Sequence, residues 1–144
     1  MPHPSLLVSA QSVDEPTHAP ANRHALYVLE PVPNLLGRVD WTTERDRARD
    51  DLQRALERFG YPTDVEVEAL VDPTDWARQG LAHGTPFGLS HRFLQSGPFR
   101  PSNIERRMPG LLFTGASTVP GVGVPMVIVS GELVARRVAA MGRP

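Results

Sequence analysis

The sequence predicts a mixed α/β (α+β) fold, and three observations support this class. Short runs rich in leucine, valine and tyrosine, bounded by proline-containing turns, are typical of strands. One long segment, 43–59, carries apolar residues at helical spacing. A glycine-rich connection joins a short apolar strand at 111–116 to a second helical segment at 125–141. The 144 residues are enough for one ordinary domain with a modest core.

The first half of the chain is expected to contain two neighbouring strands and one amphipathic helix. The strands are predicted at 5–9 and 24–29, with a polar loop between them. The helix is predicted over 43–59, with a capping pair of Thr43 and Asp46. Its apolar stripe consists of Leu52, Ala55, Leu56 and Phe59. Gly60 suits the position just after the last turn of this helix.

The middle of the chain is predicted to be less regular. Residues 64–71 alternate apolar and acidic side chains, as a half-buried strand does. Asp72–Pro73 predicts the cap and first position of a short helix near 73–79, which Gly80 closes. Residues 81–110 carry few periodic signals and many glycines and prolines. A long irregular stretch of this kind is usually functional or covers a ligand.

The segment TGASTVPGVGVPMVIVSG, residues 114–131, predicts a place where backbone meets a ligand. Gly115 and Ala116 permit close approach by a bulky planar or phosphorylated group. Gly121 and Gly123 permit positive φ and leave backbone N–H groups uncovered.

The helix start that follows favours an anion or an electron-rich group. Pro125 takes the first helical position, where a missing N–H costs nothing. The aligned peptide dipoles place about half a unit of positive charge there. The alternative is that these glycines and prolines only build a tight strand-to-helix connection.

The glycines do not form a primary dinucleotide-binding turn. They do not follow G-x-G-x-x-G, and no acidic residue lies about 20 positions further on to bind a ribose. We therefore expect a secondary contact on a cofactor that is held mainly elsewhere.

Composition narrows the function further. The net charge of −1 and the lack of a polybasic segment argue against nucleic acid as a partner. Cysteine is absent, and all fifteen basic residues are arginine, which excludes thiolate and Schiff-base chemistry. The histidines show no metal-ligand spacing, so we expect no metal site. The N-terminal segment does not resemble a signal peptide, and we expect a cytoplasmic protein, with peripheral membrane contact left open.

Three segments resemble the C-terminal end of bacterial-type phytoene desaturases, which are FAD-dependent carotenoid desaturases of the amine-oxidase-like flavoproteins. They are GLLFTGASTVPGVGVPMVIVSG at 110–131, SHRFLQSGPFRPSN at 90–103 and YVLEPVPNL at 27–35. The resemblance runs from about residue 5 to residue 141. It implies the last part of a two-domain Rossmann-type oxidoreductase fold, incomplete on its own. Residues 1–90 would end the substrate-binding domain, and 91–144 would return into the FAD-binding domain.

The resemblance also implies a cofactor, a substrate and a missing partner. The cofactor would be FAD, bordered by Gly115, Ala116, Gly121, Gly123, Val124, Pro125 and Met126. The substrate would be an apolar polyene such as phytoene, which loses a hydride to the flavin. The N-terminal FAD-binding portion would have to come from the same polypeptide or from a partner, and we expect no activity without it. Two alternatives are a non-catalytic fragment or small binding module without FAD, and a related carotenoid isomerase or ketolase.

No catalytic base is evident from the sequence. His91, Gln95 and Arg100 lie in the irregular stretch and are the candidates for the flavin-side pocket, with His91 able to move a proton near neutral pH. In the alternative interpretation, His91 and Gln95 are a polar pair on one helical turn, and Arg100 fixes the loop through carbonyl groups.

Overall fold

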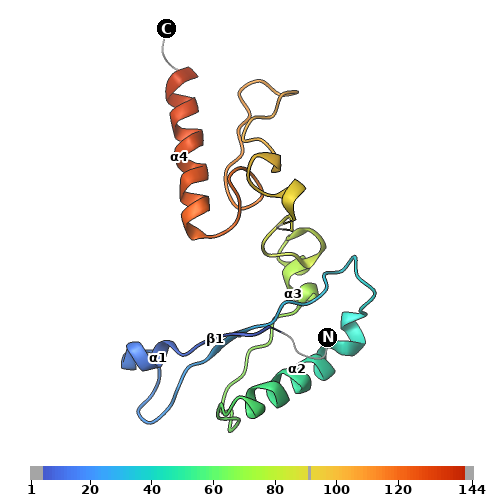
Figure 1. Ribbon diagram of the computed structural model, residues 1–144, viewed down its shortest axis with the longest axis vertical. Helices are drawn as coiled ribbons and strands as arrows, with labels where there is room; N and C mark the ends of the chain where they lie inside the picture. The colour runs from blue at the N-terminus through green and yellow to red at the C-terminus, as the bar shows by residue number, and fades with distance from the viewer. Residues whose placement is uncertain (1–4, 91, 142–144) are drawn as a thin grey trace. The chain divides into compact units, whose positions relative to one another are not determined.

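The computed structural model describes residues 5–90 and 92–141 (Figure 1). The chain divides into two compact units, Met1–Asp75 and Trp76–Pro144. Helices and strands both occur among the described residues, so the predicted mixed α/β class is confirmed. In chain order, with η for short 3-10 helices, the elements are β1 (Leu7–Ser9), α1 (Gln11–Asp14), η1 (Pro16–His18), β2 (Tyr27–Leu29), α2 (Trp41–Arg58), α3 (Pro73–Arg78), η2 (Ala82–Gly84), η3 (Phe93–Gln95), η4 (Gly97–Phe99) and α4 (Val124–Met141).

In the first unit, β1 and β2 form a two-stranded antiparallel sheet. They lie within the strands predicted at 5–9 and 24–29, and the register pairs Leu7 with Leu29. The predicted loop between them folds into α1 and η1. A sheet of two strands covers little apolar surface, so Leu7 and Tyr27 remain 58% and 54% exposed.

The helix α2 begins earlier than predicted. Asp40 is its N-cap, because the Asp40 carboxylate accepts hydrogen bonds from the N–H of Thr42 at 3.0 Å and from its hydroxyl at 2.6 Å. The predicted capping pair of Thr43 and Asp46 is therefore wrong, since Thr43 already lies inside the first turn. At the other end, Gly60 has φ +81°, as predicted for the residue that ends the helix.

The helix α2 has a buried side chain near each of its ends. Trp41 is buried, and its indole N–H donates to the carbonyl of Pro33 at 3.0 Å. Ala55 is also buried, as the predicted stripe requires. Phe59 belongs to the same predicted stripe but is 69% exposed. The stripe therefore buries its middle and leaves its last residue uncovered.

The predicted strand at 64–71 is wrong. Within the described residues this segment pairs with no strand, and Val67 is 90% exposed. Alternation alone does not make a strand, because the backbone also needs a neighbouring ladder. Side chains hold the segment instead: Arg23 donates to Glu66 at 2.7 Å, and Gln53 donates to Glu68 at 3.1 Å.

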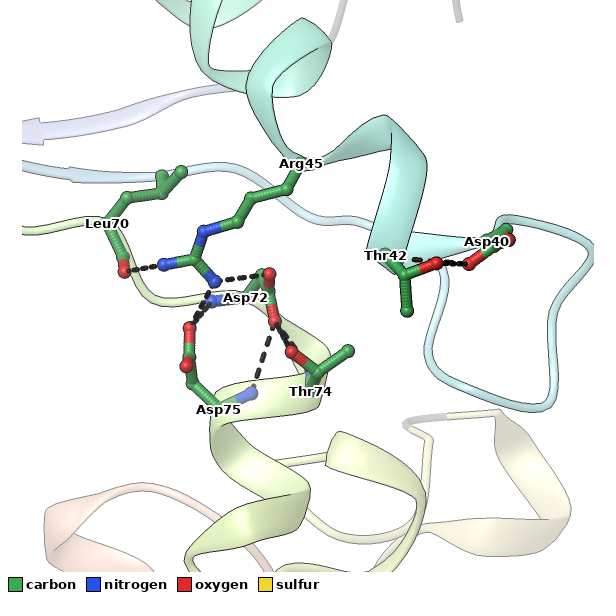
Figure 2. A network of polar contacts seen from close by, with 7 residues as sticks. All are labelled: Asp40, Thr42, Arg45, Leu70, Asp72, Thr74 and Asp75. Carbon is green, nitrogen blue, oxygen red and sulfur yellow. Dashed lines mark hydrogen bonds and ion pairs between the residues drawn. The ribbon is translucent and has the colours of Figure 1, made fainter.

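Arg45 of α2 joins this helix to the segment that leads into α3 (Figure 2). Its guanidinium donates to the carboxylate of Asp75 at 2.6 Å, to the carboxylate of Asp72, and to the carbonyl of Leu70 at 2.7 Å. The Asp72 side chain is only 4% exposed, whereas that of Arg45 is 34% exposed. In this network, one half-buried cation therefore binds two carboxylates and one carbonyl.

Asp72 also caps α3, as predicted. Its carboxylate accepts from the N–H of Thr74 at 2.6 Å and from the N–H of Asp75 at 3.1 Å, while the Asp75 carboxylate accepts from the N–H of Asp72 at 3.0 Å. Burial raises the pKa of Asp72, and the hydrogen bonds from Thr74, Asp75 and Arg45 lower it. The hydrogen bonds have the larger combined effect, so the pKa lies below its ordinary value. Gly80, with φ +86°, follows this helix as predicted.

The second unit contains mostly irregular backbone before α4. The predicted irregular stretch at 81–110 is confirmed, with short turns η2, η3 and η4 inside it. The predicted strand at 111–116 is wrong, because the described backbone there makes only an isolated antiparallel bridge between Ile104 and Leu112. The predicted helix at 125–141 is confirmed and starts one residue earlier. None of the helices described in either unit is long and apolar enough to cross a membrane.

We predict that Asp72→Ala lowers the free energy of unfolding by about 2 kcal/mol, because it removes the α3 cap and a buried acceptor of Arg45 together. Urea unfolding of the chain measures this loss. Asp51→Ala is the matched control, since Asp51 pairs with Arg54 at 2.6 Å on an exposed face of α2 and should cost well under about 1 kcal/mol. Equal losses in the two variants would contradict this role of Asp72.

A second prediction concerns acid. Because the pKa of folded Asp72 lies below 3.8, its carboxylate stabilises the fold fully above that pH, and the contribution is lost as the pH falls through the lower folded value. Asp72→Asn keeps a capping oxygen but does not titrate. The stability gap between the parent chain and this variant should therefore be largest near neutral pH and should narrow in acid. A gap that stays constant in unfolding curves across this pH series would refute the assignment.

Candidate functional site

The glycine-rich turn before α4 adopts the backbone conformations that its glycines permit. Gly115, Gly121 and Gly123 have φ values of +117°, +145° and +106°, which side-chain-bearing residues rarely adopt. The peptide bond between Val119 and Pro120 is cis. The predicted positive φ at Gly121 and Gly123 is thereby confirmed.

The polar groups of the turn divide into two sets. The N–H of Gly115 donates to the hydroxyl of Ser130 at 3.1 Å, and the carbonyl of Gly115 accepts from the N–H of Thr118 at 3.2 Å. The N–H groups of Gly123, Val124 and Met126, by contrast, have no acceptor among the described residues. The start of α4 therefore offers unpaired donors together with the positive end of its dipole.

The residues at the start of α4 are open to solvent. Val124 is 76% exposed, Met126 40% and Ile128 67%, and Gly123 and Pro125 are exposed as well. An added Cβ at Gly123 would have no neighbour within 4 Å. The unpaired donors thus lie beside an exposed apolar surface rather than inside a core.

Arg100 also binds the turn. Its guanidinium donates to the carbonyls of Gln95 at 3.0 Å, Leu89 at 3.4 Å and Ala116 at 2.9 Å. The residue is only 4% exposed, and its Nε has no hydrogen-bond partner in the described part of the chain. A Cβ on buried Gly121 would lie 3.3 Å from the Arg100 side chain. These carbonyl contacts are those expected of an arginine that fixes the loop.

The other two residues predicted near a flavin-side pocket are not both described. The side-chain oxygen of Gln95 accepts from the hydroxyl of Ser90 at 2.6 Å, and its carbonyl accepts from Arg100. His91 lies outside the described residues, so its predicted pairing with Gln95 stays a prediction.

Sequence reasoning missed a cluster of buried polar residues in the second unit. Asn103, Thr118 and Ser130 are 2%, 7% and 0% exposed and share hydrogen bonds; we call these three residues the polar hub. The Asn103 amide also donates to the carbonyls of Phe113 at 3.0 Å and Val119 at 3.3 Å. The available signal was a serine inside the otherwise apolar start of a helix, in the run VIVSG.

We predict that Arg100→Met lowers the free energy of unfolding of the second unit by about 2 kcal/mol or more, because three carbonyls lose a charged donor. Hydrogen exchange of the backbone N–H groups around Ala116 should quicken with it. Arg92→Met is the control, since Arg92 is exposed. Exchange at the same rate in both variants would show that Arg100 does not fix the turn.

Comparison with known proteins gives a consistent result, although no family model matches the chain. It is 44% identical to a phytoene dehydrogenase of Streptomyces griseus over 96% of this chain and 28% of that protein. It is 43% identical to a zeta-carotene-forming phytoene desaturase of Myxococcus xanthus, over 93% and 27%. It is 36% identical to a 4,4'-diapophytoene desaturase of Staphylococcus haemolyticus, over 92% and 28%. The chain thus spans little more than a quarter of these relatives, and over nearly its whole length it is homologous to the C-terminal portion of bacterial-type phytoene desaturases.

Proposed function

We propose that this chain forms the flavin-facing end of an FAD-dependent carotenoid desaturase. The observation that carries the proposal is the start of α4, where three N–H groups without acceptors lie beside exposed apolar side chains. A helix start of this kind suits an electron-rich group. The homology to phytoene desaturases, which are FAD-dependent enzymes, supports FAD as that group.

The residues that would hold FAD have different parts in this proposal. The backbone N–H groups of Gly123, Val124 and Met126 would donate hydrogen bonds to the cofactor or lie beside it. Pro125 would border the cofactor at the start of the helix. Gly115 and Ala116 would contribute surface, because the Gly115 N–H and the Ala116 carbonyl already have partners in the protein.

Bound FAD would supply the hydride acceptor for a C–H bond of an apolar polyene such as phytoene, with a proton lost from the adjacent carbon. The part of the protein is to orient the substrate and to exclude water. Val124 and Met126 present apolar surface beside the donors, and the dipole of α4 favours the negative charge that reduction adds.

His91 stays the candidate for proton transfer in this proposal, since an imidazole can move a proton near neutral pH. Gln95 and Arg100 are proposed to fix the loop in this part of the chain instead. The Arg100 guanidinium faces carbonyl groups, and the Gln95 amide faces Ser90.

The partner of this chain in the proposal is an N-terminal FAD-binding portion that holds the cofactor's diphosphate, in the same polypeptide or in another. Residues 1–90 are proposed to complete a substrate-binding domain, and residues 91–144 to complete the FAD-binding domain. The exposed apolar side chains of α4, which include Ile128 at 67% and Val138 at 54%, offer a surface for that portion. Peripheral contact with a membrane surface would give access to an apolar polyene.

A chimera tests the proposal. The C-terminal portion of the Streptomyces griseus phytoene dehydrogenase is replaced with this chain, and the purified protein is examined for flavin absorbance and for products from phytoene. Retained flavin and desaturated products are expected. A folded, colourless chimera would favour the non-catalytic module, and isomerised or oxygenated products would favour the carotenoid isomerase or ketolase.

We predict that Gly123→Val lowers the flavin content of this chimera several-fold, because the valine side chain would enter the space beside the unpaired donors. Gly110→Val is the matched control. Gly110 also has positive φ, +88°, and also has no neighbour within 4 Å of an added Cβ, so it carries the same backbone cost away from the turn. Equal flavin content in the two variants would remove Gly123 from the proposed site.

A further inference from the structure

The polar hub draws its members from three separate parts of the second unit. Asn103 lies in the irregular stretch after η4, Thr118 lies in the glycine-rich turn, and Ser130 lies in the second turn of α4. The Asn103 amide nitrogen is 3.1 Å from the Thr118 hydroxyl and 3.2 Å from the Ser130 hydroxyl. The two hydroxyls are 3.1 Å apart.

This burial is unusual for its surroundings. All three residues are at most 7% exposed, whereas the apolar side chains just before Ser130 in α4 stay substantially exposed. Burying polar groups costs free energy unless each one finds a partner. Because hydrogen bonds are directional, a satisfied polar cluster fixes one arrangement of the backbone, which an apolar cluster of the same volume does not.

The hub occupies both backbone polar groups of Gly115, at the beginning of the turn. Ser130 accepts from the N–H of Gly115 at 3.1 Å, and the Thr118 hydroxyl donates to the carbonyl of Gly115 at 3.1 Å. Both backbone groups of Gly115 are therefore turned inward. The N–H groups of Gly123, Val124 and Met126 are left without acceptors among the described residues.

We propose that Asn103 is a positioning residue for the flavin: it touches no cofactor itself, but through Thr118 and Ser130 it fixes the turn against α4 and so sets the direction of the unpaired N–H groups. This inference rests on the proposed function. In this inference, the buried amide of Asn103 controls how the unpaired N–H groups are directed toward the flavin.

The experiment uses the chimera saturated with FAD, so that spectra report the position of the flavin and not its occupancy. Asn103→Asp is nearly isosteric, but its carboxylate cannot donate to the carbonyls of Phe113 and Val119. Thr118→Val removes a hub hydroxyl without changing side-chain volume, and Thr118→Ser keeps that hydroxyl. Ser102→Ala is the matched control, because the Ser102 hydroxyl accepts only from the nearby N–H of Ile104 among the described residues and lies outside the hub.

We expect Asn103→Asp and Thr118→Val to raise the dissociation constant of FAD about tenfold and to shift both the visible absorption band and the reduction potential of the bound flavin. Thr118→Ser and Ser102→Ala should match the unsubstituted chimera. If Asn103→Asp does not fold, the comparison of Thr118→Val with Thr118→Ser is sufficient to test the inference.

Two other results would count against the inference and are distinguishable. Variants with lower melting temperatures but an unchanged flavin band and potential at saturation would show a hub that only stabilises the fold. An unsubstituted chimera that is folded but binds no FAD would overturn the proposed function, and this inference with it.

Discussion

The contact between the Gly115 N–H and the Ser130 hydroxyl is the constraint on which the candidate site depends. It attaches the beginning of the glycine-rich turn to the body of α4, so the turn and the helix form one piece. Asn103 secures the same hydroxyl from a third segment. Arg100 holds the next residue of the turn through the Ala116 carbonyl. With these contacts in place, the donors at the helix start keep a fixed direction.

The first unit is built on a similar principle with charged groups. Arg45 and the carboxylates of Asp72 and Asp75 join α2 to the start of α3 (Figure 2). Among the described residues of this unit, the buried apolar side chains are Trp41, Ala55 and Pro73. Directed polar contacts at helix ends therefore do much of the organising that an apolar core performs in larger domains.

Features encoded by neighbouring residues were predictable from the sequence. The cap at Asp72, the helix ends at Gly60 and Gly80, the helix α4 and the positive φ of Gly121 and Gly123 all follow from local chemistry. The strands predicted at 64–71 and 111–116 were wrong because a strand exists only with a paired neighbour, which periodicity does not reveal. The polar hub was missed for a related reason, since Asn103 and Ser130 meet across 27 positions of sequence.

The absence of ionisable groups from the hydrogen bonds of the polar hub has its own consequence. An amide and two hydroxyls carry no net charge, so neither protons nor dissolved salt alter the attraction between them in the range where proteins work. The hydrogen-bond acceptors of the Arg100 guanidinium are likewise neutral carbonyls. The hydrogen bonds of the polar hub should therefore change little with acidity or ionic strength.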